Sequence, residues 1–359
     1  MRRFVANEAL VRRCSQGETA AIFVNGGGVR QLLVNIETGL PFFDRFFVPS
    51  YAFMLVVAFA VAFVLSRRQA LDIGLDKVKI TDLGVYLILF ALVGARLAHV
   101  LFDGMLSDYV NLCFHPSRVA IPGLDHLVCH ANADCRAGGV GAVCDLAGGH
   151  CHPARDCLAA FRFWQGGMTY YGGLLAALAF GSYYVRRHKM AWGKVLDVFG
   201  LLLPLGLAFG RVGCFLNGCC YGRVSHLPWA VRFPPGSFAS YGQYQAGQLS
   251  SADVASLPVH PTQVYSALFN LAIFFWVLFV VSPKKRFHGQ VMASFLLWYS
   301  VGRFLVEIFR ADPRGGLWFL STSQVISVLV GAVVGLWMLR RRSQGADQQG
   351  CQDVAPDMR

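Results

Sequence analysis

Four arginines lie within or beside stretches of sequence that are otherwise apolar: Arg96, Arg211, Arg303 and Arg310. One acid, Glu307, accompanies them, and its spacing places it on one helical face with Arg303 and Arg310. A structural interpretation is an Arg303–Glu307 ion pair that locks helices together, with Arg310 extending to the membrane surface. The surplus of positive charge favours an anionic ligand instead. A lipid phosphate is the anion available in a bilayer, and arginine binds it through two parallel hydrogen bonds.

Glycines accumulate beside these arginines. The relevant positions are Gly166-Gly167, Gly172-Gly173 and, after Arg211, Asn217-Gly218 and Gly222. Glycine lets a backbone break or approach a ligand closely. The same residues also suit close packing between helices, so both interpretations remain open.

The elements that must position these side chains are transmembrane helices. Hydrophobic residues make up 55% of the 359 residues and charged ones only 14%, whereas about a quarter of a soluble domain is charged. A transmembrane helix needs roughly 20 mostly apolar residues. The sequence therefore predicts an all-α polytopic membrane protein with about seven transmembrane helices, at residues 48–66, 82–102, 167–185, 192–212, 267–282, 287–308 and 320–339.

Basic clusters follow the first, third, fifth and seventh of these windows: Arg67-Arg68, Arg186-Arg187, Lys284-Lys285-Arg286 and Arg340-Arg341-Arg342. Cytoplasmic loops carry such an excess of basic residues. We therefore expect a cytoplasmic C-terminus, an external N-terminus and external loops at 103–166, 213–266 and 309–319. Contact with acidic membrane lipids explains the formal net charge of +12, and no nucleic-acid partner is expected.

The loop between the second and third windows is rich in cysteine. It holds six of the 11 cysteines: Cys113, Cys129, Cys135, Cys144, Cys151 and Cys157. An even number of cysteines on the oxidising side of a membrane favours disulfides, whose pairing the sequence does not determine. The alternative is a metal site that combines thiolates with His130, His150 and His152, although the loop contains no compact Cys-x-x-Cys pair.

The domain organisation follows from these segments. Residues 1–47 form an N-terminal extension without the apolar core of a signal peptide, either poorly ordered or upstream of the true start. Residues 48–342 form the seven-helix domain, with the cysteine-rich loop inserted at 103–160. The polar tail at 343–359 is expected to be disordered in the cytoplasm.

The motifs, taken in order, resemble the prolipoprotein diacylglyceryl transferase family of bacterial inner-membrane enzymes. These motifs extend across nearly the whole span from the first to the seventh window. Residues 1–47, the loop at 103–160 and the C-terminal tail lie outside the resemblance. The motifs are Tyr51, Gly94-Ala-Arg96, Gly166-Gly-Met-Thr-Tyr-Tyr-Gly172-Gly173, Gly210-Arg211-Val-Gly213, Asn217-Gly218, Gly222, His260-Pro-Thr-Gln263-Val-Tyr265 and Arg303-Phe-Leu-Val-Glu307-Ile-Phe-Arg310.

The resemblance implies a reaction and its partners. The family moves the diacylglyceryl group of phosphatidylglycerol to the thiol of a lipobox cysteine in a prolipoprotein signal peptide and releases glycerol phosphate. It implies no cofactor, and no metal is assigned. Arg211 and Arg303 would hold the phosphate, and Glu307 would orient Arg303. Substrate binding would involve Tyr51, Arg96, Gly166, Gly172, Asn217, Gly222 and Arg310.

Three positions depart from the family pattern. Tyr171 stands where a histidine is usual, Cys214 where an asparagine is usual, and Cys219 near the place of an acidic residue. We expect Tyr171 to orient or deprotonate the thiol, with His260 as an alternative base or a packing residue. Cys214, Cys219 and the adjacent Cys220 could form a covalent intermediate, a metal site, a Cys214–Cys219 disulfide or plain packing contacts.

Two functions of other classes remain as alternatives. A catalytically inactive relative would bind membrane lipid or lipoprotein without transferring anything. A transporter would carry inverted repeats, and the arginine motifs do not recur at a fixed interval.

Overall fold

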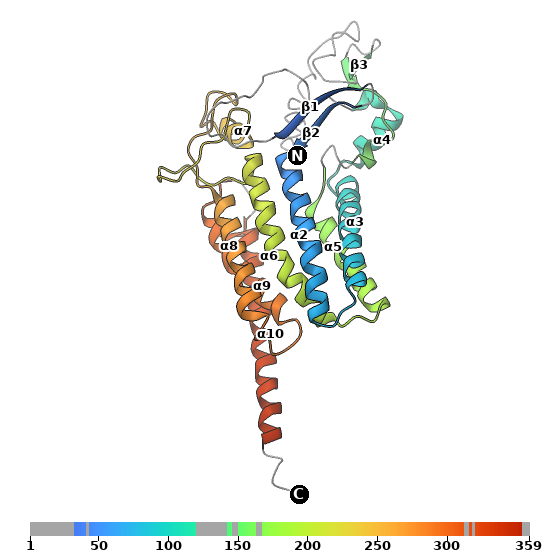
Figure 1. Ribbon diagram of the computed structural model, residues 1–359. Helices are drawn as coiled ribbons and strands as arrows, with labels where there is room; N and C mark the ends of the chain where they lie inside the picture. The colour runs from blue at the N-terminus through green and yellow to red at the C-terminus, as the bar shows by residue number, and fades with distance from the viewer. Residues whose placement is uncertain are drawn as a thin grey trace. The chain divides into compact units, whose positions relative to one another are not determined.

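The computed structural model describes residues 32–40, 43–119, 142–145, 150–162, 167–311, 316–317 and 320–353. The chain divides into two compact units: one includes residues 82–188, and the other comprises residues 24–81 and 189–359. The first unit contains the cysteine-rich loop, and the second contains the helices that carry Arg211 and Arg303 (Figure 1).

The first unit consists of helices joined by a disulfide-bonded loop. Its elements are most of α3 (Lys77–Phe102), then α4 (Leu106–Phe114), η1 (Pro116–Arg118), the antiparallel pair β3 (Ala142–Asp145) and β4 (His150–Pro153), η3 (Ala159–Phe161) and α5 (Tyr170–Arg187).

The predicted disulfides are confirmed in the described part of this loop. Cys113 is bonded to Cys157. Cys144 and Cys151 are disulfide-bonded as well. These thiols are therefore not free to bind a metal. Cys129, Cys135 and His130 lie outside the described residues.

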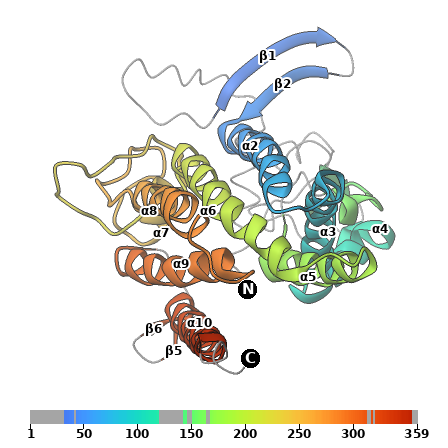
Figure 2. The same ribbon diagram turned by 60° about the horizontal axis from the view of Figure 1, so that its bottom comes forward.

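The second unit is a helical bundle preceded by a β-hairpin. Its elements are β1 (Leu32–Leu40), β2 (Phe43–Pro49), α2 (Ser50–Asp72), α6 (Trp192–Asn217), α7 (Phe238–Gln245), α8 (Thr262–Trp276), the π-helical turn η5 (Val277–Val281), α9 (Gln290–Ile308), β5 (Gly316–Leu317), β6 (Leu320–Ser321) and α10 (Thr322–Asp353). Helix α6 packs against α2 and also against α8 and α9, while α10 packs against α9 (Figures 1 and 2).

The interior of this bundle lies between α6, α8, η5 and α9. Its buried side chains are Leu201, Leu205, Ile273, Phe274, Val277, Val281, Val291 and Phe295. In contrast, large apolar side chains such as Phe53, Phe59 and Phe63 on α2 are exposed. Apolar side chains on the outside of the bundle suit contact with lipid. The helical backbone suits it as well, because its hydrogen bonds are satisfied within the helix.

Six helices in the described residues are long and apolar enough to cross a membrane: 50–72, 77–102, 192–217, 262–281, 290–308 and 322–341. They correspond to six of the seven predicted windows, so the fold class of an all-α polytopic membrane protein is confirmed. The remaining window, 167–185, corresponds to α5, which has 18 residues and is not among the six. The count of seven and the orientation stay predictions.

Two segments differ from the sequence expectations. Residues 32–49 form a hairpin in which Ile36 pairs with Phe46 and Glu37 with Arg45, within the segment predicted as a poorly ordered extension. Helix α10 continues to Asp353, past the expected start of the disordered tail at residue 343. Extending an existing helix needs no new nucleus, so a polar segment can continue the helix without an apolar face.

Asp197 connects two helices at one end of the bundle. Its buried Oδ1 accepts hydrogen bonds from the N–H groups of Gly289 (2.9 Å) and Val291 (3.0 Å), at the start of α9. Its Oδ2 accepts one from Lys285 Nζ (3.1 Å). A carboxylate here satisfies unpaired N–H groups of a helix N-terminus and complements its dipole.

We expect Asp197→Asn to lower the free energy of unfolding by about 2 kcal/mol, because hydrogen bonds to a charged acceptor contribute about 1.5–3 kcal/mol and the amide is neutral. Thermal unfolding of the purified protein in detergent measures the change. The exposed Asp253 supplies the matched control, Asp253→Asn. Equal midpoints for the two variants would contradict the role given to Asp197.

Candidate active site

Glu307, near the end of α9, lies close to two arginines: Arg303 on the same helix and Arg310 just after its end. Its Oε2 lies 2.8 Å from Arg303 Nη2 and 4.0 Å from Arg310 Nε, and its Oε1 accepts a hydrogen bond of 3.1 Å from Ser321 Oγ. Arg303 Nη2 also lies 2.9 Å from Ser323 Oγ, to which it donates. The predicted ion pair is therefore present, and it holds the Arg303 guanidinium in one orientation.

Arg211 and Arg303 line the same pocket. Its other lining residues are Ser266, Phe269 and Asn270 of α8 and Tyr299 and Gly302 of α9. Within the described part of the chain, no hydrogen bond or ion pair engages the half-buried Arg211 guanidinium. The pocket thus presents a guanidinium group that still needs an anionic partner.

Asn270 adds a polar group to this pocket. Its Nδ2 donates to the carbonyl of Ser266 (2.7 Å), while its buried Oδ1 has no partner among the described residues. A buried amide oxygen without a partner is costly in an apolar helix. Asn270 is therefore a candidate contact for a hydroxyl group of a bound ligand.

Tyr51, in the first turn of α2, lies beside Arg211. Its ring packs against Gly213 of α6, where a Cβ atom would come within 2.9 Å of ring atom Cδ2. Its hydroxyl group interacts electrostatically with Arg211 and with the cysteines that follow it. The structure thus brings the predicted residues Tyr51, Arg211 and Arg303 together within the second unit.

The segment after α6 is clamped between the ends of two other helices. Gly222 forms a β-bridge with Arg310, and its N–H donates to the carbonyl of His260 (3.0 Å). A Cβ atom at Gly222 would come within 2.7 Å of the carbonyl oxygens of His260 and Phe309. Gly222 therefore permits close backbone packing, the structural alternative considered for it. Asn217 is the last residue of α6.

His260 is packed among aromatic side chains. Its ring lies 5.2 Å from that of Phe309, and its Nδ1 lies 3.3 Å from the hydroxyl of Tyr265. That hydroxyl in turn accepts a hydrogen bond from Trp229 Nε1 (2.8 Å). These contacts favour the packing role of His260 over that of a catalytic base.

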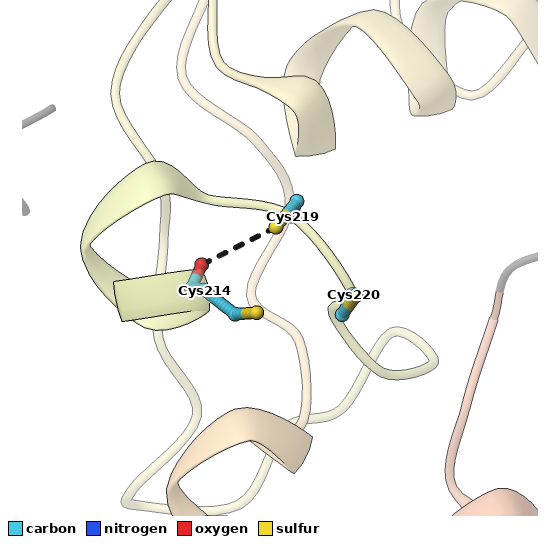
Figure 3. Close-up of side chains that lie close together, drawn as sticks. All are labelled: Cys214, Cys219 and Cys220. Atoms are coloured by element: carbon cyan, nitrogen blue, oxygen red, sulfur yellow. Dashed lines mark hydrogen bonds between the residues drawn. The ribbon is translucent and has the colours of Figure 1, made fainter. Parts of the chain in front are cut away.

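Three free thiols gather at the end of α6 (Figure 3). The sulfur atoms of Cys214, Cys219 and Cys220 all lie within 4.8 Å of one another. Cys219 Sγ lies 3.7 Å from the carbonyl oxygen of Cys214 and donates to it. The Cys214–Cys219 disulfide considered from the sequence is not formed.

Arg96, in the first unit, is committed to the backbone of a loop. Its Nε, Nη1 and Nη2 atoms donate to the carbonyl oxygens of Ala160 (2.8 Å), Gly167 (2.9 Å) and Ala159 (2.7 Å) respectively. The side chain is buried. These contacts hold the loop before α5, so they give no support to the predicted role of Arg96 in substrate binding.

The other predicted site residues of the first unit lie near the start of α5. Tyr171 is 58% exposed, with its ring 5.6 Å from that of Tyr170. Gly172 packs against Gly94 and Ala98, where a Cβ atom on either glycine would collide with the opposite helix. Gly172 therefore serves helix packing. Gly166 lies outside the described residues.

The family of the chain follows from comparison with known proteins. The model of the prolipoprotein diacylglyceryl transferase family matches residues 41–121 and 145–341, which include Tyr51, Arg96, Arg211, Arg303 and Arg310. The chain belongs to this family. It is also a multi-pass membrane protein, as its apolar helices require.

Several phosphatidylglycerol–prolipoprotein diacylglyceryl transferases are similar to this member of the family. The one from Solidesulfovibrio magneticus is 31% identical over 306 residues, which cover 83% of this chain and 92% of that protein. The one from Geobacter sulfurreducens is 28% identical over 301 residues, with coverages of 81% and 91%. The one from Erwinia tasmaniensis is 36% identical over 199 residues, with coverages of 52% and 67%.

Sequence reasoning missed some polar residues of this transferase. Asn270 lies inside an apolar window, and its isolated polarity could have indicated it. Sequence reasoning also missed His99 and Asp103. Nδ1 of His99 lies 2.9 Å from Oδ2 of Asp103. Nε2 of His99 is buried and has no hydrogen-bond partner among the described residues. Hydrogen bonds from Thr169 (2.6 Å) and His99 lower the pKa of the Asp103 carboxyl. Their spacing of four residues was the available signal.

Proposed function

We propose that the chain transfers the diacylglyceryl group of phosphatidylglycerol to the thiol of a lipobox cysteine in prolipoproteins and releases glycerol phosphate. The observation that carries this proposal is the pocket that Arg211 and Arg303 share in a chain of this family. The relatives bear the name of this activity.

The chemistry requires little beyond positioning and positive charge. The sulfur attacks the glycerol carbon, a C–S bond forms, and the C–O bond to phosphate breaks. The leaving phosphate is a stable anion, so it needs no general acid. Guanidinium groups fixed where negative charge develops stabilise the transition state. Arg303, held by Glu307 at 2.8 Å, and Arg211 would supply them.

The remaining residues take supporting roles in this proposal. Tyr51, beside Arg211, would contact the lipid headgroup. Arg310 would add positive charge next to Glu307. Asn217 and Gly222 would shape the turn after α6, and Arg96 would position the loop before α5.

The reaction also implies a location. Phosphatidylglycerol and exported prolipoproteins meet in the bacterial inner membrane, and the basic clusters favour a cytoplasmic C-terminus. The cysteine-rich loop at 103–160 would then face outward, where disulfides form.

Complementation of a bacterium depleted of its own transferase tests the function. We expect growth, together with thioether-linked diacylglyceryl on its lipoproteins. Normal amounts of the protein in the membrane without such modification would overturn the proposal and favour an inactive relative that binds lipid or lipoprotein.

Tyr171 is proposed to orient the substrate thiol. We expect Tyr171→Phe to lower kcat/KM by about tenfold, because it removes a hydroxyl that bonds the thiol and leaves the ring in place. Transfer to a lipobox peptide in membranes measures the effect. The neighbouring Tyr170→Phe is the matched control, and full activity of Tyr171→Phe would contradict this role.

A further inference from the structure

The three thiols at the end of α6 have the spacing of a metal-binding site. Zinc–sulfur bonds of about 2.3 Å in a tetrahedral site place the sulfur atoms about 3.8 Å apart. The sulfur atoms of Cys214, Cys219 and Cys220 already lie within 4.8 Å of one another. Small side-chain rotations therefore suffice to close the site around one ion.

The backbone that carries these thiols is held rigidly. Gln263 Nε2 donates to the carbonyl of Cys219 (2.7 Å), and Thr262 Oγ1 donates to the carbonyl of Cys220 (2.8 Å). The side chains of Thr262 and Gln263 are buried at the start of α8. The ligand set is thus fixed by a neighbouring helix as well as by its own turn.

Cys220 itself has an unusual backbone conformation. Its φ of 61° lies in the left-handed region, which residues other than glycine rarely adopt. Such a conformation is unfavourable and persists where the surrounding contacts impose it, commonly at functional sites. The left-handed Gly218 (φ 72°) precedes it and reverses the chain after α6. Together the two turns bring Cys219 and Cys220 back toward Cys214.

The chemistry of the donors selects the ion. Soft thiolates favour zinc or copper(I) over magnesium, calcium or manganese. Structural zinc sites have four protein ligands, whereas catalytic sites have three and leave one position open. Among the described residues, this group of potential ligands contains only the three cysteines. Three ligands correspond to the open kind of site.

We propose that Cys214, Cys219 and Cys220 bind a zinc ion whose open position takes the thiol of the prolipoprotein substrate. This inference rests on the proposed transferase function. It assigns a role to Cys214, which stands where the family usually has an asparagine, and to Cys219, which stands near the usual place of an acid.

The substrate thiol binds zinc and releases its proton to water, since a coordinating thiol is deprotonated. A sulfur electron pair then forms the C–S bond with the glycerol carbon, and the C–O bond breaks with its electrons moving to the phosphate oxygen. The product is a thioether, which is neutral and a weaker ligand than a thiolate, so it leaves the zinc ion.

The surrounding charges suit such a site. A zinc ion with three thiolates carries a net negative charge, and a fourth thiolate adds another. Arg310 and Arg211 both lie within electrostatic range of Cys220. They offset this charge and keep the attacking sulfur close to the phosphate that Arg211 is proposed to hold.

Metal content and spectroscopy test the site directly. We expect the purified full-length protein, kept reduced, to bind one zinc ion per chain by elemental analysis. Cys214→Ser, Cys219→Ser and Cys220→Ser should each weaken binding by at least tenfold, whereas Cys351→Ser should not. With Co²⁺ in place of zinc, sulfur-to-cobalt absorption should increase when a lipobox peptide is added, and not with its serine analogue.

The pH dependence of transfer separates this role from a structural one. A free thiol with a pKa of about 8.5 is only a few per cent thiolate at pH 7, so zinc activation contributes up to about 30-fold there. Cys219→Ser or chelation should therefore reduce transfer by up to about 30-fold at pH 7 and by progressively less above pH 8.5. Added Zn²⁺ should restore the chelated protein.

Distinct outcomes overturn the two proposals. The zinc site fails if the wild-type protein binds no more Zn²⁺ than the triple serine variant, or if mass spectrometry finds these cysteines in a disulfide. It also fails if the cobalt spectrum does not change when the lipobox peptide is added, or if the serine variants transfer the diacylglyceryl group at the wild-type rate. Zinc binding and a peptide-dependent spectrum without any transfer would instead preserve the site and refute the transferase function.

Discussion

Arg211→Ala is expected to lower kcat/KM for diacylglyceryl transfer by about 100- to 1000-fold, the effect of removing one preorganised charge donor from a transition state. The Arg211 guanidinium lines the pocket with Arg303 and has no hydrogen-bond or ion-pair partner in the described part of the chain. Its removal should therefore affect the bound phosphate far more than the fold.

The measurement is transfer to a lipobox peptide in vesicles of phosphatidylglycerol. Arg211→Lys should lie between the wild type and Arg211→Ala, because lysine keeps the charge and loses the two-pronged geometry. Arg68→Ala, at an exposed position of α2, controls for the general loss of a basic residue. An Arg211→Ala protein within tenfold of wild type would contradict the proposed role of this arginine.

Glu307→Ala is expected to lower the free energy of unfolding by about 3–5 kcal/mol, the cost of leaving a buried charge without its partner. Glu307 is buried and pairs with Arg303 at 2.8 Å. Arg303 also experiences the positive charges of Arg310 and Arg211. Without the carboxylate, these guanidinium groups repel one another inside the bundle.

Thermal unfolding in detergent measures this loss. Ser321→Ala removes the hydroxyl that donates to Glu307 (3.1 Å) and accepts from the N–H of Gln324 (3.2 Å), and it should cost about 1–2 kcal/mol. A Glu307→Ala protein no less stable than Ser321→Ala would show that the carboxylate does not hold the arginines together.

Local patterns in the sequence predicted the parts of the structure that depend on neighbours along the chain. The Arg303–Glu307 pair follows from a spacing of four residues on one helix. The apolar windows predicted the helices, although α3 and α8 begin earlier than expected, at Lys77 and Thr262. Polar residues continue these helices beyond the apolar segments, and hydropathy does not register them.

Contacts between distant segments could not be predicted in this way. Arg96 reaches carbonyl oxygens 63 to 71 residues further along the chain, and no local pattern encodes that distance. The three thiols meet because Gly218 and Cys220 adopt left-handed conformations and because Gln263 and Thr262 hold the turn from another helix. The residue types at positions 214–220 alone favoured a disulfide or packing contacts, with a metal site or a covalent intermediate as alternatives.

The most direct test of the transferase function is mass spectrometry of a lipobox peptide incubated with the purified protein and phosphatidylglycerol. We predict a gain of one diacylglyceryl mass on the cysteine, release of glycerol phosphate in equal amount, and no reaction with the serine analogue of the peptide. An unmodified cysteine, with the folded protein present and phosphatidylglycerol in excess, would contradict the function proposed for this chain.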